Sequence, residues 1–366
     1  MKNAIAKSPL TLAAAAVGLL AAYTDMGNAA ATTYTFTTIS TFGGANSKAY
    51  GINDSGTVTG YADTASGSYH AYIYSGGSMT DLGTLGGSSS YAYGINDAGI
   101  VVGGARTSSG ALHAFSDSTG TPSATMTDLK TLGGSSSAAY AINGTGEIVG
   151  YADNVSGNYN AFIYSGGTMT NLGTLGGSTS NALGINNAGT VVGYSATSGG
   201  ARNAFSDATG TPGATMADLG TLTGNSTSAG YGVNTGGTIV GYSGRTPFIY
   251  SGGAMSGLSE TGYATAVNTT GTVVGAALNG SGYHAFSYSG GAFTDLNSVT
   301  MNLPSAFTLS RAEGINSLGD IVGYGINASG NTEAFLLTPT PEPTSLALLA
   351  LGGLGLLVRR RPLAKV

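Results

Sequence analysis

Short runs of alternating apolar and polar residues recur along most of the chain, and glycine-rich turns separate them. In residues 91–132 we distinguish four such runs, at 91–96, 100–103, 112–116 and 126–132. Asp97-Ala98-Gly99 supplies a turn that tolerates positive φ between the first two runs. Runs this short and rich in Val, Ile, Thr, Tyr and Phe are typical of strands, so the unit is predicted to contain four of them.

The unit occurs seven times, and two markers follow it along the chain. The first is the asparagine of a Gly/Ala-Ile/Val-Asn core: Asn53, Asn96, Asn143, Asn186, Asn234, Asn268 and Asn316. The second is an aromatic residue after alanine or its substitute: Tyr72, Phe115, Phe162, Phe205, Phe248, Phe286 and Phe335. The mean repeat of about 44 residues lies in the range of four-stranded propeller blades, whereas a β-solenoid needs a much shorter coil. The sequence therefore predicts an all-β fold, a single seven-bladed β-propeller over residues 32–338.

The two ends of this region predict how the ring closes. The last unit reaches Thr338 and Pro339 without a fourth strand, while residues 34–42 resemble the fourth strand of the other units. Pairing the spare strand with the incomplete blade would leave no open sheet edge. The fifth unit lacks about ten residues after Gly241, which is interpreted as a tolerated deletion or, alternatively, as a binding notch.

Residues 1–31 have the three parts of a secretory signal peptide. Lys2 and Lys7 precede an apolar run at residues 10–22, and small residues follow, so cleavage is predicted near Ala31. The alternative is an N-terminal membrane anchor, but this apolar run is shorter than the roughly 20 residues that span a bilayer.

Residues 339–366 have the order of a sorting tail. Pro341, Glu342 and Pro343 precede an apolar run at residues 345–358, and Arg359, Arg360 and Arg361 follow directly. This order resembles the bacterial PEP-CTERM tail, with Pro341-Glu342-Pro343 as its motif. The resemblance implies a membrane-embedded exosortase-type processing enzyme as partner. It also implies transient anchoring in the inner membrane through residues 345–358, and delivery to the cell surface or extracellular matrix of a Gram-negative-type bacterium. A plain C-terminal anchor is the alternative, although the apolar run is short for one.

Thr-Leu-Gly-Gly and Asn-Asp-x-Gly signatures recur between residues 41 and 337, as at Thr84-Leu85-Gly86-Gly87. Together they resemble the extracellular HAF-repeat family, which also implies a protein that works outside the cell.

Charge and composition narrow the function further. Without the two terminal segments the chain carries six Lys or Arg against fifteen Asp or Glu, so no basic stripe is available for a nucleic-acid backbone. The chain has no cysteine, which excludes disulfides, thiolate nucleophiles and Cys-ligated metals. It has no tryptophan either, so any aromatic surface for sugars must come from its 21 tyrosines.

Candidate catalytic residues are sparse. His70, His113 and His284 occupy one repeat position in three different units, which predicts separate locations around the ring rather than one metal or catalytic centre. A second position holds Asp81, Asp128, Asp218 and Asp295, interpreted as turn acceptors, as are Asp54 and Asp97. Calcium at these oxygen-rich loops is a possible cofactor; no other cofactor is predicted.

Six charged residues break the repeat and are the candidates for a unique site: Glu147, Arg245, Glu260, Arg311, Glu313 and Asp320. A glycoside hydrolase would need two facing carboxylates, and Glu260 and Glu313 are the candidates for them. No P-loop, His-Glu-x-x-His motif or nucleophile elbow occurs. The sequence therefore predicts an exported, non-enzymatic protein that binds polysaccharide or surface proteins or contributes to an extracellular polymer, with a secreted carbohydrate-active enzyme as the alternative.

Overall fold

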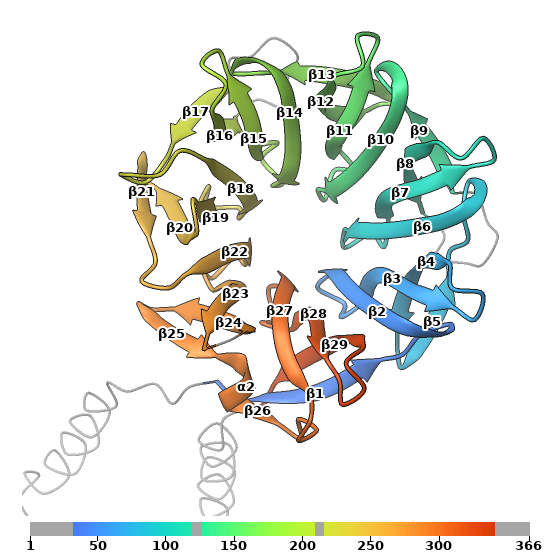
Figure 1. The fold of residues 1–366 in the computed structure, drawn as a ribbon, viewed down its shortest axis with the longest axis vertical. Helices are drawn as coiled ribbons and strands as arrows, with labels where there is room; N and C mark the ends of the chain where they lie inside the picture. Colours follow the sequence, from blue (N-terminus) through green and yellow to red (C-terminus); the bar gives the residue numbers. More distant parts are fainter. Residues whose placement is uncertain (1–31, 119–125, 209–215, 281, 341–366) are drawn as a thin grey trace, which may run out of the picture. The chain divides into compact units, whose positions relative to one another are not determined.

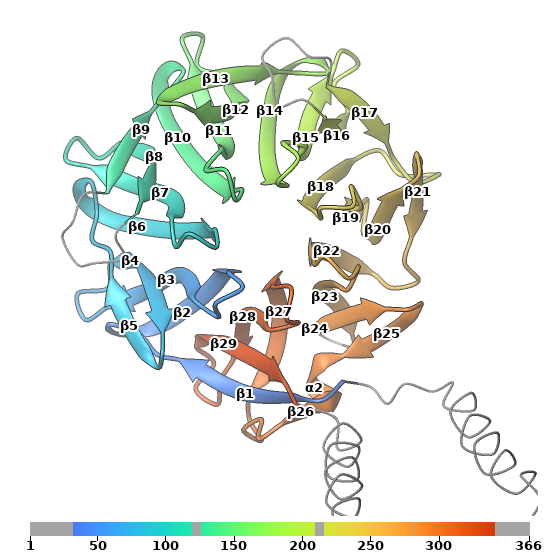
Figure 2. The same cartoon turned by 180° about the vertical axis from the view of Figure 1, so that it is seen from behind.

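The structure, a computed structural model, describes residues 32–118, 126–208, 216–280 and 282–340. These residues form seven sheets that surround a central channel (Figure 1), and Figure 2 shows the same ring from behind. Neighbouring strands are antiparallel except β26 (Thr300–Met301), which pairs parallel with β1 (Tyr34–Ile39). The predicted seven-bladed β-propeller is therefore confirmed. The predicted signal peptide and most of the sorting tail lie outside the described residues.

Each of the first six blades has four strands, numbered outward from the channel. The first three blades are β2 (Gly43–Ile52), β3 (Val58–Thr64), β4 (Tyr69–Ser75) and β5 (Ser78–Asp81); β6 (Gly86–Ile95), β7 (Val101–Thr107), β8 (Leu112–Asp117) and β9 (Thr127–Lys130); and β10 (Gly133–Ile142), β11 (Ile148–Asn154), β12 (Tyr159–Ser165) and β13 (Thr168–Gly173). The next three are β14 (Gly176–Ile185), β15 (Val191–Thr197), β16 (Arg202–Asp207) and β17 (Ala217–Gly220); β18 (Ser228–Val233), β19 (Ile239–Ser243), β20 (Thr246–Ser251) and β21 (Ala254–Gly257); and β22 (Gly262–Val267), β23 (Val273–Asn279), β24 (Gly282–Ser289) and β25 (Ala292–Asp295).

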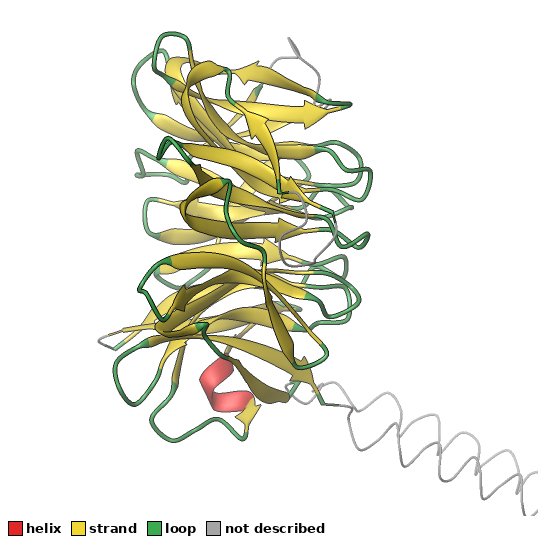
Figure 3. Cartoon of the chain, turned by 90° about the vertical axis from the view of Figure 1, so that its right-hand side faces the viewer, coloured by secondary structure: helices red, strands yellow, loops and turns green. Residues whose placement is uncertain are grey.

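The seventh blade is completed by the N-terminal strand. β27 (Thr308–Ile315), β28 (Ile321–Ile326) and β29 (Thr332–Pro339) come from the end of the chain, and β1 (Tyr34–Ile39) pairs antiparallel with β29. A one-turn helix, α2 (Leu296–Val299), and the two-residue β26 (Thr300–Met301) precede this blade and lie at its rim (Figure 3). The predicted closure is thus confirmed, although the strand ends at Ile39 and not at Phe42, because Gly43, with φ +93°, already begins β2.

The first strand of the example unit was predicted too short, since β6 begins at Gly86 and not at Tyr91. The additional residues at its start pair with β7: Gly86 lies opposite Thr107, and after a register shift Ser90 lies opposite Ala105. Glycine and serine carry no strand signal of their own, so this extension depends on pairing that the local sequence does not announce.

The hydrophobic core consists of clusters between adjacent blades. The aromatic marker of each unit is at most 1% exposed and lies across the sheet from a glycine, as Phe115 does from Gly103. A Cβ on Gly103 would lie 2.8 Å from Cε1 of Phe115 and 1.9 Å from the carbonyl oxygen of Tyr91, so only glycine fits there. Burying each aromatic ring contributes roughly 2–3 kcal/mol, and the same contribution recurs in every blade.

The blades are also joined by buried serines. Ser90 of the second blade donates to the carbonyl oxygen of Gly83 and accepts a 2.8 Å hydrogen bond from the Ala71 amide of the first blade. Ser47 does the same at the closure, between the Ile39 carbonyl oxygen and the Ala334 amide.

No helix among the described residues is long and apolar enough to cross a membrane.

Candidate functional site

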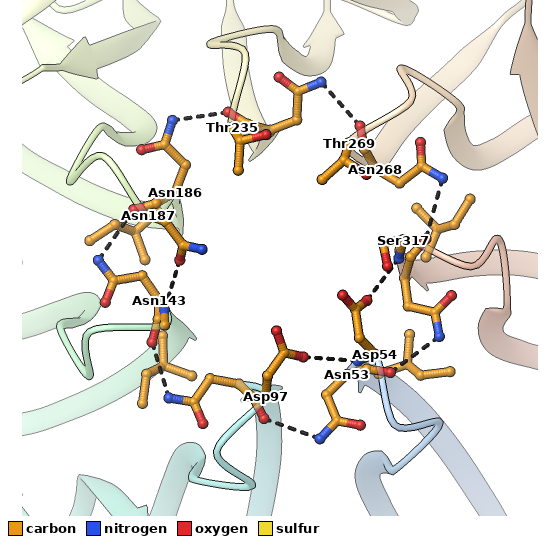
Figure 4. Close-up of a pocket in the computed structure, with 18 of the residues that line it drawn as sticks. Asn53, Asp54, Asp97, Asn143, Asn186, Asn187, Thr235, Asn268, Thr269 and Ser317 are labelled. Carbon is orange, nitrogen blue, oxygen red and sulfur yellow. Dashed lines mark hydrogen bonds between the residues drawn. The ribbon is translucent and has the colours of Figure 1, made fainter.

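A closed ring of seven asparagines lies at one end of the channel (Figure 4). The Nδ2 atom of each asparagine donates to the main-chain carbonyl oxygen of the asparagine in the next blade, at 2.9–3.2 Å, and the bond from Asn316 to Asn53 completes the circle. Each Oδ1 atom accepts from the amide four residues on. These side chains are 3–8% exposed, so the ring fastens the blades together and leaves few amide groups for a ligand.

The ring also explains the Gly/Ala-Ile/Val-Asn core of each unit. Around the channel axis the inner strands approach closely, and a Cβ on Gly94 would lie 2.9 Å from the Tyr140 carbonyl oxygen of the next blade. A small residue two positions before asparagine is therefore required by the convergence of the inner strands.

We call the side of the propeller that carries these turns the Asn-turn face; a cavity of about 230 Å³ opens there. Its polar groups are largely paired, since the Asp54 amide donates to Asp97 Oδ1 and the Ser317 amide donates to Asp54 Oδ1, both at 2.9 Å. No cluster of three or more His, Asp or Glu side chains able to hold a metal ion occurs in the described ranges.

The opposite end of the channel is surrounded by tyrosines. Seven tyrosines of the first three blades form a continuous chain of ring contacts from Tyr69 through Tyr61, Tyr50, Tyr93, Tyr140 and Tyr151 to Tyr159, and Tyr91 joins it from the side; all centroids are 5.0–6.5 Å apart. The remaining blades add further tyrosines through ring pairs or through a cation over the ring: Tyr194, Tyr231, Tyr242, Tyr263, Tyr283 and Tyr324. We call this side the tyrosine face.

The centre of the tyrosine face contains a cavity of about 200 Å³ with three neighbouring charged groups. Arg311 and Glu313 lie on β27 and line the cavity, and Lys48 comes from β2 of the adjoining first blade. Arg311 Nε is 2.7 Å from Glu313 Oε1, but its N–H is not directed at that oxygen, so the contact is an ion pair without this hydrogen bond.

Both cations of the cluster also lie over aromatic rings. The Lys48 ammonium is 4.4 Å from the centroid of the Tyr324 ring, and the Arg311 guanidinium carbon is 4.4 Å from that of Tyr263. Lys48 makes no ion pair within the described part of the chain. The cluster therefore holds two cations against one carboxylate.

Burial shifts the titration of these groups. It raises the pKa of Glu313, which has only 8% of its side chain exposed, while Arg311 and Lys48 act in the opposite direction. Burial also lowers the pKa of Lys48, partly offset by Glu313. The pKa values of Tyr231 and Tyr324 rise to about 12, in both cases chiefly through burial, so these phenols remain protonated donors at neutral pH.

The histidines occupy three separate blades, as predicted, but each has a partner that was not foreseen. His70, His113 and His284 lie 2.7–3.0 Å through Nδ1 from Asp81, Asp128 and Asp295 on the neighbouring outer strand. The aspartates also accept the amide two residues on, as turn acceptors should. The His284–Asp295 pair lines a third cavity, of about 170 Å³, together with Glu260.

The other residues that break the repeat lie apart from Arg311 and Glu313. Glu147 and Asp320 accept hydrogen bonds from the ring asparagines Asn143 and Asn316, so both belong to the Asn-turn face. Arg245 lies in the two-residue turn between β19 and β20, where the shortened fifth blade makes a tight connection. Because Glu260 and Glu313 line different cavities, the structure does not bring together the two carboxylates proposed for a hydrolase.

Three comparisons relate the chain to known proteins. A model for a protein of unknown function, DUF3466, matches residues 78–175, and a model for the PEP-CTERM protein-sorting motif matches residues 339–361. The search of curated proteins found no significant match.

Among solved structures, a mutant of AofleA from Arthrobotrys oligospora matches with 13% identity and a TM-score of 0.39, covering 71% of this chain and 88% of that one. Aleuria aurantia lectin in complex with α-methyl-L-fucoside matches with 12% identity and a TM-score of 0.35, covering 85% of this chain and 97% of the lectin. Likeness at this level does not carry the ligands of those proteins over to this chain.

The sorting match spans Pro341, Glu342, Pro343 and the arginine cluster, all outside the described residues, and it marks the chain as an exported substrate of exosortase-type sorting. The chain is therefore a seven-bladed β-propeller protein with a C-terminal PEP-CTERM sorting motif.

Proposed function

We propose that this exported propeller is a non-enzymatic binding protein of the cell surface or extracellular matrix, and that its tyrosine face binds saccharide. The observation that carries the proposal is the set of tyrosine rings on the tyrosine face, contiguous across the first three blades and continued by separate pairs in the other blades. Tyr159 and Tyr283, at the outer part of this array, are 36% and 41% exposed.

Tyrosine suits this role for two physical reasons. Its ring offers a flat apolar surface, and its hydroxyl can hydrogen-bond with a polar ligand, so one side chain meets both kinds of surface on a sugar. It also has few rotatable bonds, and the ring contacts within the array restrict these further, so little conformational entropy is lost on binding.

The enzymatic alternative has less support. Glu313 is the one carboxylate among the residues that line the tyrosine-face cavity, whereas glycoside hydrolysis ordinarily needs two.

The sorting tail completes the proposal: processing near Pro341 would release the propeller from transient inner-membrane anchoring. An intact mass of the exported protein that ends at Val366 would contradict that processing.

Direct binding measurements test the saccharide proposal. The exported protein is titrated with extracellular polysaccharide from its own host and with oligosaccharide fragments of that polymer, by calorimetry and by tyrosine fluorescence. Tyr61, which contacts three other rings, is replaced by alanine. We expect affinity to fall about fivefold, as for the loss of roughly 1 kcal/mol of ring contact.

Tyr74→Ala is the matched control. Tyr74 lies in the same blade and packs against the core between blades, away from the tyrosine face. The Tyr74→Ala variant should have a lower melting temperature but the same affinity for saccharide as the wild-type protein. Equal binding by wild-type protein and Tyr61→Ala, or turnover of the saccharide, would refute the proposal.

A further inference from the structure

We infer that the centre of the tyrosine face recognises a carboxylate-bearing sugar, with its carboxylate at Lys48 and Arg311. This inference rests on the proposed saccharide binding and specifies the class of ligand. It begins from a charge imbalance: Arg311 and Glu313 line the cavity, and Lys48, a neighbour of both outside the lining, makes two cations against one carboxylate in a chain whose described part is otherwise acidic.

Lys48 makes no ion pair within the described residues, and Glu313 acts on it only over a longer distance. It is half-buried on an inner strand and lies over the Tyr324 ring. Arg311 is deeper, and Glu313 compensates its charge. An incoming carboxylate would therefore pair with Lys48 first, and would share Arg311 with Glu313.

The surroundings favour a single acidic sugar. Tyr50, Tyr93, Tyr140 and Tyr231 line the cavity and present aromatic rings and protonated hydroxyls to a sugar ring. At about 200 Å³ the cavity has room for roughly one monosaccharide unit.

Carboxylates at the outer part of the tyrosine face limit the ligand's charge density. Asp63 accepts two hydrogen bonds from Asn46, and Asp153 accepts one from Ser135, on the strands that also carry Tyr61 and Tyr151. They would repel a densely charged polyanion passing over them. The expected ligand is therefore a terminal or isolated uronic acid on a largely neutral chain.

A matched pair of ligands tests this inference. The exported full-length protein is titrated with two oligosaccharides that differ only at the non-reducing end, one with glucuronic acid and the other with glucose. We expect the acidic ligand to bind about tenfold more tightly, a difference of about 1.4 kcal/mol. The preference should shrink as salt is raised from 0.05 to 0.5 M, a range chosen because added salt screens partly exposed charges (about 10 Å screening length at 0.1 M).

Variants that change one charge test which residue causes the preference for the acidic oligosaccharide. Lys48→Gln should abolish the preference for the acidic ligand, whereas Lys48→Arg should retain it. Lys130→Gln removes an exposed lysine paired with Asp128 at the outer part of the ring and should change neither affinity. The salt titration of the wild-type protein tests the same charge even if a variant does not fold.

The outcomes separate this inference from the proposal beneath it. Equal affinity of wild-type protein for both oligosaccharides, or an undiminished preference in Lys48→Gln, would overturn the recognition of an acidic sugar and leave saccharide binding standing. Failure of both oligosaccharides and of the host polysaccharide to bind would overturn both.

Discussion

The asparagine ring predicts a large loss of stability from one small substitution, Asn186→Ala. Asn186 donates to the Asn234 carbonyl oxygen at 2.9 Å and accepts from the Thr190 and Ala188 amides at 2.9 and 3.0 Å. Truncation removes all three hydrogen bonds at a side chain that is only 5% exposed. Water replaces the acceptor at Ala188, which is exposed, while the Thr190 amide is left without its partner.

The magnitude follows from these contacts. An unsatisfied, partly buried amide costs about 1–3 kcal/mol, and the bond to Asn234 contributes about 1 kcal/mol more. The Asn234 carbonyl oxygen still accepts from Gly237, which keeps the total near 2–4 kcal/mol. For a propeller of this length, that loss corresponds to a fall in melting temperature of about 3–6 °C.

Circular dichroism melting and equilibrium guanidinium unfolding followed by tyrosine fluorescence measure the effect, since the chain has no tryptophan. Asn158→Ala is the control, because the Asn158 side chain makes no hydrogen bond within the described residues and lies in a loop. A loss below 1 kcal/mol, or no greater than in the control, would refute the role assigned to the ring.

A second variant, Asn186→Asp, separates hydrogen bonding from volume. At neutral pH it places a carboxylate oxygen against the Asn234 carbonyl oxygen, whereas the protonated acid can donate as the amide does. The pKa of the new carboxyl should therefore be raised in the folded state. Stability should then be close to wild type at about pH 4 and decrease as the pH rises. A deficit that does not depend on pH would contradict this account.

Two further predictions concern closure and acid stability. Deleting residues 34–42 removes β1 and with it Ile39 from the core between the seventh and first blades, so the protein should fail to fold or melt far lower; an unchanged melting curve would exclude the closure. Burial raises the pKa of Asp295, but hydrogen bonds from His284 and Asn297 outweigh it and leave the pKa below its ordinary value of about 3.9. The stability from Asp295 is thus present above about pH 4 and lost as the pH falls through its lowered pKa, so the melting temperatures of wild type and Asp295→Asn should converge in acid; a constant difference from pH 2 to 7 would contradict this.

The fold was predictable because the residues that each blade requires recur at the same positions in every unit. Each blade needs asparagine at the channel and a buried aromatic residue opposite glycine, and both markers can be counted along the chain. The spare segment beginning at Tyr34 predicted the closure for the same reason, since it copies a strand that the last unit lacks.

The pairing of histidine with aspartate was predictable in principle but was missed. Gly76 and Gly77, both with positive φ, form a two-residue turn of the kind that fixes hairpin register. That register places Tyr72 opposite Asp81, so the side chain of His70 reaches Asp81 diagonally. The two repeat positions were interpreted separately, although the turn between them sets their distance.

The tyrosine face could not be located from local pattern. Tyr50, which lines the cavity, lies at a register shift between Ala49 and Gly51 of the inner strand, and the local pattern gives no sign of that shift. Lys48 and Glu313 meet only because the ring closes, bringing together residues from opposite ends of the propeller sequence. Glu313 and Arg311 break the repeat and could therefore be singled out in the sequence. Only the closure of the ring makes them neighbours of Lys48.

The position of the chain ends gives the propeller a direction. The Thr340 amide donates to the Thr33 carbonyl oxygen at 2.9 Å, and Pro339 lies beside Gly319, in the turn that follows Asn316 on the Asn-turn face. The last described residues before the sorting motif therefore lie on the side opposite the tyrosine face. On the proposed transient anchoring, the Asn-turn face is the side next to the point of attachment, and the tyrosine face keeps the same access to ligand before and after release.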